Sequence, residues 1–431
     1  MSPPAAFMDR ICALVAARPP LSARDRGEAV LAFEDTYAVA LAGWREPVSQ
    51  ACARLYGVGA PLADPFAGAA EHVAFVHATA GHALDYDDVH LVSVTHPSVV
   101  IAPALLALAE ARPQARARVL GAFAVGVAVN IALGRALGFQ HYELGWHATS
   151  TIGPLAGAAA ASHLLGLDEA QTRSALALAA AQAGGLQRNF ASMAKPAQAG
   201  FASAAAVRAA LMAEAGVTGD ADAFAAKGYL VLYGEPAALA RAAQTPIEID
   251  MGSLSRKLYP CCYAAHRMIA AALAARVQLN AAQIAAARFR VDVPAGTMRP
   301  LRVTDPRDGA EGKFCGAYIV AVALQTGAVT LGDFTAAAVR RAEIRALMAR
   351  IEIVEENHPG QIPPALEHGV VRVEAATDGR LLAAAECRYS PGSPGAPAAA
   401  AQMDTKIHDC LAAFGMAPAA FRTALHPRIG L

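Results

Sequence analysis

The feature that most constrains this chain is a long series of helix-forming segments in its first 250 or so residues. Apolar side chains recur there at the spacing that places them on one face of a helix. The expected helices are residues 24–42, 69–84, 98–111, 118–137, 153–165, 168–183 and 196–215. Gly216 follows the last of them as a helix stop. This series predicts a large all-α domain.

Beyond Pro260 the pattern becomes a mixture of helices and strands. One more helix is expected up to about Val277, and further helices at residues 314–326 and 335–348. The expected strands are residues 287–293, 370–375 and 381–387. The last two flank Thr377-Asp378-Gly379-Arg380, a sequence typical of a hairpin turn. This block is therefore predicted to be α+β.

The length of the chain favours more than one domain, because 431 residues are too many for a single comfortable core. Residues 390–397 are rich in Pro, Gly and Ser, as a linker is, and a short helix is expected from Asp404 to Phe414. We expect a mainly α protein with a helical domain at 1–253, a smaller α+β lid domain at 254–392, and a segment at 393–431 that returns to the helical domain.

Composition excludes several classes of partner. The 36 basic and 36 acidic residues balance, so no excess of positive charge is available for a nucleic acid. The seven cysteines show no CxxC spacing, which fits a reducing compartment and predicts a cytoplasmic protein. The N-terminal stretch lacks the apolar run of a secretory signal, because Asp9, Arg10 and Arg18 interrupt it.

The most apolar stretches predict buried helices rather than membrane spans. Residues 119–134 and 152–167 are rich in Ala and Gly, are short for a bilayer, and contain Asn130 or His163. With 55% hydrophobic residues overall, the chain also favours a buried dimer surface. We therefore expect no membrane partner and a homodimer.

Four ionisable side chains stand at or just before an expected helix start. They are His96 before Pro97, His147 before residues 149–154, Lys195 before Pro196, and Lys257 before Pro260. A helix start offers free N–H groups and a positive dipole end, which favour an anion. Hydroxyl groups such as that of Ser98 are available beside them. If the four converge, they form a pocket for a small molecule with several carboxylates.

The densest polar cluster runs from His82 to His90 and continues to His96. On a helix, His82, Asp85 and Asp88 would share a face, so that a carboxylate could orient a histidine. His96 lies at a positive helix end that favours a neutral ring, which makes it the expected general base. The competing interpretation is that the aspartates cap a helix in water and that His96 is an ordinary turn histidine.

The other three positions also allow two interpretations. His147 is placed to protonate a leaving group or a carbanion, or it lies in a surface loop beside a packed Trp146. Lys195 has an apolar setting in which a substrate carboxylate would pair with it, or its ammonium group reaches solvent. Lys257 is a second carboxylate clamp or an exposed residue.

Metal and nucleotide sites have weak support. His72, His77 and His82 recur every five residues, so on a helix of about 3.6 residues per turn they point in different directions. Asp85, Asp87 and Asp88 could bind a cation, but they lack the spacing of a ligand loop. No dinucleotide-binding or phosphate-binding glycine motif is present in the sequence. We expect no cofactor.

At these same residues the sequence resembles the MmgE/PrpD family, which includes 2-methylcitrate dehydratase, cis-aconitate decarboxylase and iminodisuccinate epimerase. The matching segments are His82-Ala83-Leu84-Asp85-Tyr86-Asp87-Asp88, Thr95-His96-Pro97-Ser98, Gly145-Trp146-His147, Lys195-Pro196 with Gly200, Gly216-Val217-Thr218-Gly219, Lys257-Leu258-Tyr259-Pro260-Cys261-Cys262 with His266, and Lys313-Phe314-Cys315-Gly316-Ala317-Tyr318. They follow one another in order over most of the chain.

The resemblance implies a helical domain completed by the C-terminal tail, an inserted α+β lid, a homodimer and chemistry without metal or organic cofactor. By position it places Asp85, His96, His147 and Lys195 at the active site, with Lys257 and Tyr318 joining from the lid. Two positions depart from the family pattern: Val89 replaces a Thr of the decarboxylase-like pattern, and Gln198 replaces a frequent His.

The predicted function is a cofactor-independent lyase that dehydrates a small 2-hydroxy di- or tricarboxylate, as 2-methylcitrate dehydratase does. His96, oriented by Asp85, takes the carbon-bound proton, and His147 protonates the departing hydroxyl. Lys195 and Lys257 hold carboxylates, and Tyr318, Gln198 and Ser98 are expected to contact the substrate. The alternatives are epimerisation or decarboxylation of a related polycarboxylate, and a non-catalytic protein that binds polycarboxylates.

Overall fold

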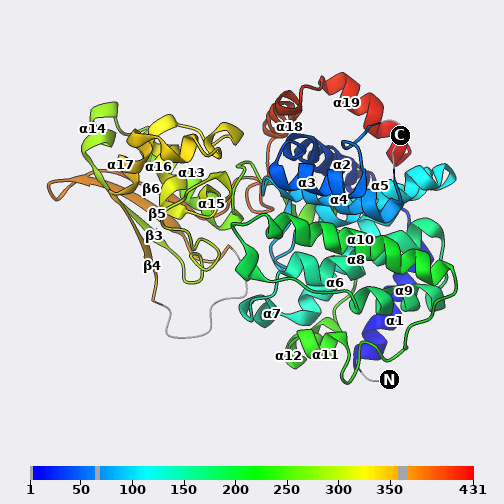
Figure 1. Ribbon diagram of the computed structural model, residues 1–431. Coiled ribbons are helices and arrows are strands. Elements are labelled where there is room, and N and C mark those ends of the chain that lie inside the picture. The colour runs from blue at the N-terminus through cyan, green and yellow to red at the C-terminus, as the bar shows by residue number, and fades with distance from the viewer. Residues whose placement is uncertain (1–2, 64–67, 358–366) are drawn as a thin grey trace.

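The structure is a computed structural model that describes residues 3–63, 68–357 and 367–431. Figure 1 shows two lobes, one built almost entirely of helices and one that contains a sheet. The helical lobe consists of α1 (Pro3–Ala17), α2 (Ala23–Gly43), α3 (Pro47–Tyr56), α4 (Ala70–His82), α5 (Pro97–Ala111), α6 (Val119–Leu137), α7 (Phe139–Glu143), α8 (Ala148–Leu165), α9 (Glu169–Ala180), α10 (Ala194–Glu214), α11 (Tyr229–Tyr233), α12 (Pro236–Ala242), α18 (Ala400–Phe414) and α19 (Pro418–Leu425). The prediction of a mainly α protein is confirmed.

The mixed lobe lies between α12 and α18 in the sequence and has its own hydrophobic core. Its helices are α13 (His266–Arg276), α14 (Ala281–Ala286), α15 (Gly309–Gly312), α16 (Gly316–Thr326) and α17 (Ala342–Met348). Its strands are β3 (Arg288–Val293), β4 (Ile351–Glu355), β5 (Val371–Thr377) and β6 (Arg380–Cys387). The strands β1 (Val89–His90) and β2 (Leu254–Ser255) form a short antiparallel ribbon. It pairs a segment of the helical lobe with the segment that leads into the mixed lobe.

The sheet of the mixed lobe has the strand order β4-β3-β5-β6. β3 pairs with β4 in parallel, whereas the β3–β5 and β5–β6 pairs are antiparallel. Asp378 and Gly379 both have positive φ values, 50° and 78°, as the two-residue turn of a hairpin requires. The predicted hairpin is therefore confirmed, and α13 packs against its strands.

The predicted helices of the first 250 residues are all present, but one of them starts earlier than expected. α8 begins at Ala148 rather than at residue 153, so Pro154 lies inside the helix. Proline has no N–H and leaves the carbonyl four residues earlier unpaired. The N–H of Gly184 donates to that carbonyl, on Ser150, at 3.4 Å, which allows the proline within the helix. His147 consequently lies directly at the N-terminus of α8.

Two expectations for the second half of the chain are wrong. Pro260 does not begin a helix, because the backbone N–H of Cys262 is bound to the carbonyl of Lys313 and α13 starts only at His266. Lys257 therefore does not precede a helix. Of the helix expected at residues 335–348, only Ala342–Met348 is α-helical, preceded by a 3₁₀ turn at Ala338–Arg340.

The close approach of α4 and α10 positions two parts of the site. Gly200 of α10 faces α4, and a Cβ at that position would lie 2.2 Å from Oγ1 of Thr79. Only glycine allows these two helices to pack at this distance. The end of α4 at His82 and the start of α10 near Lys195 are thereby brought to the same edge of the helical lobe.

The C-terminal helices pack on the helical lobe, with α18 against α2 (Figure 1). Lys406 of α18 is buried, and its Nζ lies 2.6 Å from a carboxylate oxygen of Asp35 and 2.8 Å from the carbonyl of Tyr86. The ion pair connects the tail to α2, and the hydrogen bond to Tyr86 connects it to the segment that carries the polar cluster.

Residues Pro113–Leu137 form the one described helical stretch that is long and apolar enough to cross a membrane. Of its apolar window, 83% is buried inside the protein, as in a core helix of a large domain. The prediction that residues 119–134 are buried is confirmed. All seven cysteines, which lie in the described part of the chain, are unpaired.

Buried histidines make the stability of this fold depend on pH. Burial lowers the pKa of His77, His82, His90, His141 and His163 to about 4. In the unfolded chain these groups titrate near 6.5. Between these values the unfolded chain binds more protons, so the free energy of unfolding falls as the pH is lowered from about 6.5 to about 4.

Each such histidine contributes up to about 1.4 kcal/mol per pH unit in that window. Urea unfolding at pH 7.5, 6.5, 5.5 and 4.5 measures the effect, and the midpoint is expected to change little between the first two values and to drop steeply below pH 6. A midpoint that stays constant down to pH 5 would contradict this account.

Candidate active site

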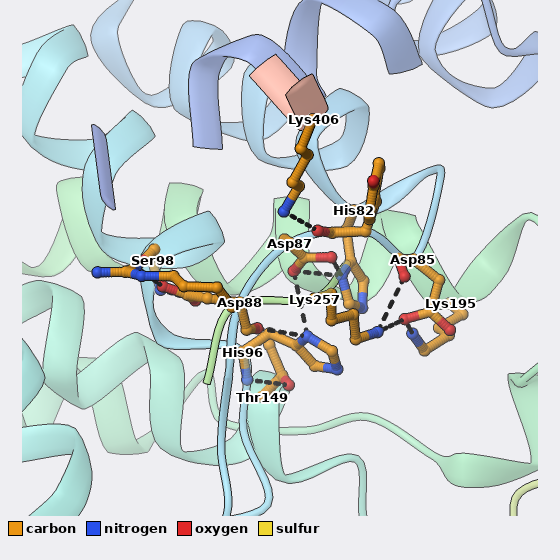
Figure 2. A network of polar contacts seen from close by, with 12 residues as sticks. His82, Asp85, Asp87, Asp88, His96, Ser98, Thr149, Lys195, Lys257 and Lys406 are labelled. Atoms are coloured by element: carbon orange, nitrogen blue, oxygen red, sulfur yellow. Dashed lines mark hydrogen bonds and ion pairs between the residues drawn. The ribbon is translucent and has the colours of Figure 1, made fainter. Parts of the chain in front are cut away.

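The ionisable residues singled out in the sequence surround one cavity between the two lobes. Its volume is about 50 Å³, and His96, His147, Lys195 and Lys257 all line it together with Asp85. A larger cavity of about 310 Å³ adjoins it and shares Asp85 and Lys195. Figure 2 shows how the side chains of this region point toward one another.

Asp85 does not orient a histidine; it pairs with the two lysines. α4 ends at His82, and Asp85 takes a positive φ of 51° in the turn that follows, so the helical face expected for residues 82–88 does not form. The Asp85 Oδ1 atom lies 2.5 Å from Nζ of Lys257 and 3.0 Å from Nζ of Lys195. The prediction that Asp85 holds His96 is therefore wrong.

The charges of this trio depend on one another. Burial alone would raise the pKa of Asp85, but the ammonium groups of Lys195 and Lys257 outweigh it and hold that pKa well below its usual value. Burial would lower the pKa of Lys257, yet the facing Asp85 carboxylate raises it. Asp85 is thus a carboxylate and Lys257 an ammonium group at neutral pH.

Asp87 is the residue that holds the histidines, a role that the sequence did not indicate. Its Oδ2 atom accepts a hydrogen bond of 2.8 Å from Nδ1 of His82 and lies 3.3 Å from Nδ1 of His96 (Figure 2). Burial would raise the pKa of Asp87, but the two facing imidazoles more than offset it and lower that pKa well below its usual value. A buried carboxylate therefore stands behind both rings.

The hydrogen bonds of His96 define which of its nitrogens is free. Its Nδ1 lies 2.8 Å from the carbonyl oxygen of Asp88, which can only accept, so Nδ1 carries the proton. In the neutral ring Nε2 is then the unprotonated nitrogen. A proton taken up at Nε2 would produce an imidazolium beside the Asp87 carboxylate, as in histidine–aspartate pairs that act as general bases.

In His147 the proton is on Nε2 rather than on Nδ1, because of a hydrogen bond from Gln198. The backbone N–H of Leu186 donates to Oε1 of Gln198 at 2.5 Å, which identifies the other end of the amide as the NH₂ group. That Nε2 lies 3.2 Å from Nδ1 of His147 and donates to it. His147 must then carry its proton on Nε2, which is buried and has no hydrogen-bond partner among the described residues.

His82 and His147 are neutral rings at neutral pH, because burial lowers the pKa of both. Burial lowers the pKa of His147 well below its usual value, and the neighbouring His82 and Lys195 lower it further. The rings of His82 and His147 stack at 5.7 Å between centroids. A neutral imidazole with its N–H directed at the reacting group can act as an electrophile. The site therefore presents one acceptor nitrogen, on His96, and one donor nitrogen, on His147.

Three residues expected to contact the substrate do not line the small cavity. Gln198 is bound to His147 and Leu186, as described above. Ser98 is fully buried, and its hydroxyl and its backbone N–H both donate to the Asp88 carboxylate. The backbone N–H of Ser98 is one of the donors at the start of α5. Because it is bound to Asp88, it is not available to a ligand.

Tyr318 is the third of these residues. It lies in the core of the mixed lobe with no exposed surface, and its hydroxyl donates to the carbonyl of Asp333. The expected role of Tyr318 in substrate binding is wrong, because its position within α16 turns the ring away from the site and into the core.

One group of described residues has the atom spacing of a metal site. The donor atoms of His82, Asp87 and His96 lie within 4.8 Å of one another. Their arrangement is explained by hydrogen bonds, because Nδ1 of each histidine points at an oxygen atom that accepts its proton. The expectation of chemistry without a metal remains a prediction.

Gln198→Glu is expected to change the protonation of His147. A carboxylate cannot donate to Nδ1, so the ring takes a proton there and its pKa rises by about one unit or more relative to the wild-type protein. Nitrogen-15 NMR of histidine-labelled protein distinguishes the two forms. The exposed Gln244→Glu is the matched control. An unchanged Nδ1 signal in the Gln198 variant would contradict the assigned hydrogen bond.

Comparisons with known proteins agree in covering both lobes. Residues 10–240 match the MmgE/PrpD N-terminal domain, and residues 259–424 match the MmgE/PrpD C-terminal domain. Cis-aconitate decarboxylase of Homo sapiens is 30% identical over 310 residues, which are 68% of this chain and 62% of that protein. The enzyme of Mus musculus is 29% identical over 317 residues, 69% of this chain and 62% of its own length.

A cis-aconitate decarboxylase-like protein of Aspergillus oryzae is 34% identical over 146 residues, which are 32% of this chain and 30% of that protein. The matched region thus spans less than two thirds of the length of each of these relatives. The two domain matches, by contrast, leave only short parts of this chain uncovered. The chain belongs to the MmgE/PrpD family.

Proposed function

We propose that this protein is a cofactor-independent lyase that dehydrates a small 2-hydroxy di- or tricarboxylate. The observation that carries the proposal is the opposite hydrogen bonding of His96 and His147 at one cavity, which leaves an acceptor nitrogen on one ring and a donor nitrogen on the other. A dehydration needs both, because one proton leaves carbon and another reaches the departing oxygen.

The reaction would proceed as follows. Nε2 of His96 takes the proton from the carbon next to a carboxylate, and the electron pair of that C–H bond forms the new C=C bond. The C–O bond breaks, and the hydroxyl leaves as water with the proton from Nε2 of His147. Transfer of the proton taken up by His96 to Nε2 of His147 then restores both neutral rings. Asp87 stabilises the imidazolium formed at His96.

Lys195 is the residue best placed to bind a substrate carboxylate in this mechanism. Its Nζ lies at the cavity between the rings of Phe190 and Phe314, 5.4 Å from each ring centroid. Asp85 satisfies only part of its charge, since Lys257 competes for the same carboxylate oxygen. An ammonium group in this dry setting stabilises negative charge that develops on the substrate.

The second candidate is decarboxylation of a related polycarboxylate. It is favoured by the three relatives, whose names describe cis-aconitate decarboxylases or a protein like them. The bond from carbon to the departing carboxylate breaks, carbon dioxide leaves, and the remaining electron pair takes a proton from His147, which a proton from solvent replaces. Val89 argues for the first candidate, because it lines the cavity where the decarboxylase-like pattern has Thr.

Incubation with hydroxy-, unsaturated and amino-polycarboxylates in deuterated water, followed by NMR, tests the proposal. Dehydration gives an unsaturated acid, decarboxylation gives a product with one carboxylate fewer, and epimerisation gives a deuterated isomer without loss of water. Tight binding of a tricarboxylate with no product over hours would instead indicate a non-catalytic binding protein. No turnover and no binding of any of these acids would refute the proposal.

We further propose that the protein acts as a homodimer in the cytoplasm. The abundance of apolar sequence supports the dimer, since 55% of residues are hydrophobic. The cytoplasmic location is supported by the seven cysteines, which show no CxxC spacing. Light scattering coupled to gel filtration measures the mass directly, and the monomer has a mass of 44.3 kDa.

A further inference from the structure

Lys313 is a buried lysine that the mechanism above does not use. It follows α15, and its side chain extends from the mixed lobe to the helical lobe, where Nζ donates to the carbonyl oxygen of Ala83 at 3.2 Å. Only 4% of the residue is exposed. Its own carbonyl accepts the N–H of Cys262, which fixes the backbone beside the segment of Lys257.

Lys313 differs from every other buried lysine of the described chain in its partners. Lys195 and Lys257 share Asp85, and Lys406 pairs with Asp35, all at 3.0 Å or less. Within the described residues no carboxylate oxygen lies within 4.0 Å of Nζ of Lys313. Burial lowers the pKa of this group, since a carbonyl compensates little for the lost hydration of an ammonium ion.

Lys313 lines the cavity of about 310 Å³ that adjoins the catalytic one. Lys195 and Asp85 belong to the walls of both cavities, so the two are neighbouring compartments of one site. The same wall contains two further carboxylates, on Glu46 and Asp308. Asp308 is occupied at the start of α15, where it accepts the N–H of Glu311.

We propose that this larger cavity is a second carboxylate-binding subsite, with Lys313 as the ion-pair partner of a substrate carboxylate that takes no part in the chemistry. The proposal rests on the proposed function, because the reacting end of the same substrate must lie at His96 and His147. The subsite makes the protein selective for acids that carry a second carboxylate, beyond the one at Lys195, over acids that have only one.

Two properties of Lys313 support this assignment. Its three N–H donors have a single acceptor among the described residues, so two remain for a ligand. The cavity beside it has room for a carboxylate and the carbon atoms attached to it. A carboxylate there would supply the opposite charge that each of the other buried lysines already has.

The test is calorimetric binding of two unreactive acids, propane-1,2,3-tricarboxylate and pentanoate, which has a single carboxylate. A hydrogen bond to a charged group contributes roughly 1.5–3 kcal/mol. Lys313→Met is therefore expected to weaken binding of the tricarboxylate by about 10- to 100-fold and that of pentanoate by less than about threefold. Lys313→Arg, which keeps the charge, should recover most of the affinity.

The exposed Lys227→Met is the matched control and should leave both affinities unchanged. Replacing an uncompensated buried charge with an apolar side chain is neutral or stabilising, so the thermal midpoint of Lys313→Met should not fall. Equal weakening of both acids, or none, would overturn the subsite. If the wild-type protein binds neither acid, the proposed function itself fails. If it binds them and only the expected effect of Lys313→Met is missing, the subsite alone fails.

Discussion

His96→Asn is expected to lower kcat by about 10²- to 10⁴-fold without loss of the fold, the range expected when a general base is removed. Asparagine can still donate to the carbonyl of Asp88, as Nδ1 of the histidine does at 2.8 Å. It cannot accept a proton at the position of Nε2. The measurement is kcat on the substrate identified by NMR, together with circular dichroism to verify folding.

Replacing Asp87, the carboxylate beside His96, should also lower kcat, and this loss should not add to that of His96→Asn. Asp87→Asn removes the carboxylate that stabilises the imidazolium, so kcat falls, but the double variant should resemble His96→Asn alone because the two residues act as a unit. His408→Asn, an exposed histidine on α18, is the control. Normal turnover by His96→Asn would remove the assignment of the base.

Asp85→Asn is expected to have the largest effect on stability. It leaves Lys195 and Lys257, which are 4% and 0% exposed, without their only carboxylate partner within 4.0 Å in the described chain. Removal of one partner from a buried ion pair costs about 3–5 kcal/mol, because an uncompensated charge remains inside the protein. Urea unfolding at pH 7.5 measures this loss.

The pH dependence of this effect follows from the lowered pKa of Asp85. The carboxylate contributes its full stabilisation above the ordinary pKa near 4 and loses it as the pH falls toward the lower value in the folded protein. Asp378→Asn, at the exposed hairpin turn, should change the stability by less than about 0.5 kcal/mol. An Asp85 variant as stable as this control would show that the lysines are compensated in another way.

The sequence indicated which ionisable residues matter better than it indicated their partners. His96 and His147 precede helix starts in the structure, as expected. Such a position can be recognised because the residues that start a helix are neighbours in the sequence. Asp87 has the role that was expected of Asp85, because Asp85 adopts a positive φ in the turn after α4 and does not continue the helix. Such a turn cannot be deduced from helical periodicity.

Contacts between distant segments explain the other errors. The bond between Gln198 and His147 joins residues 51 positions apart, and the Leu186 carbonyl and N–H that hold the amide lie in a loop between α9 and α10. That Nζ of Lys313 has no carboxylate oxygen within 4.0 Å among the described residues likewise depends on how the two lobes meet. Helical periodicity predicted most of the long helices but not α1. Strand β4 was also not predicted, because it forms next to β3 only after a crossover through the mixed lobe.

The most direct test of the account is a crystal structure of the protein with propane-1,2,3-tricarboxylate. We expect the acid between the lobes, with one carboxylate at Lys195, another at Lys313, and a carbon next to a carboxylate facing Nε2 of His96. A tricarboxylate bound elsewhere on the protein, with the cavity between His96 and His147 free of it, would contradict the central claim.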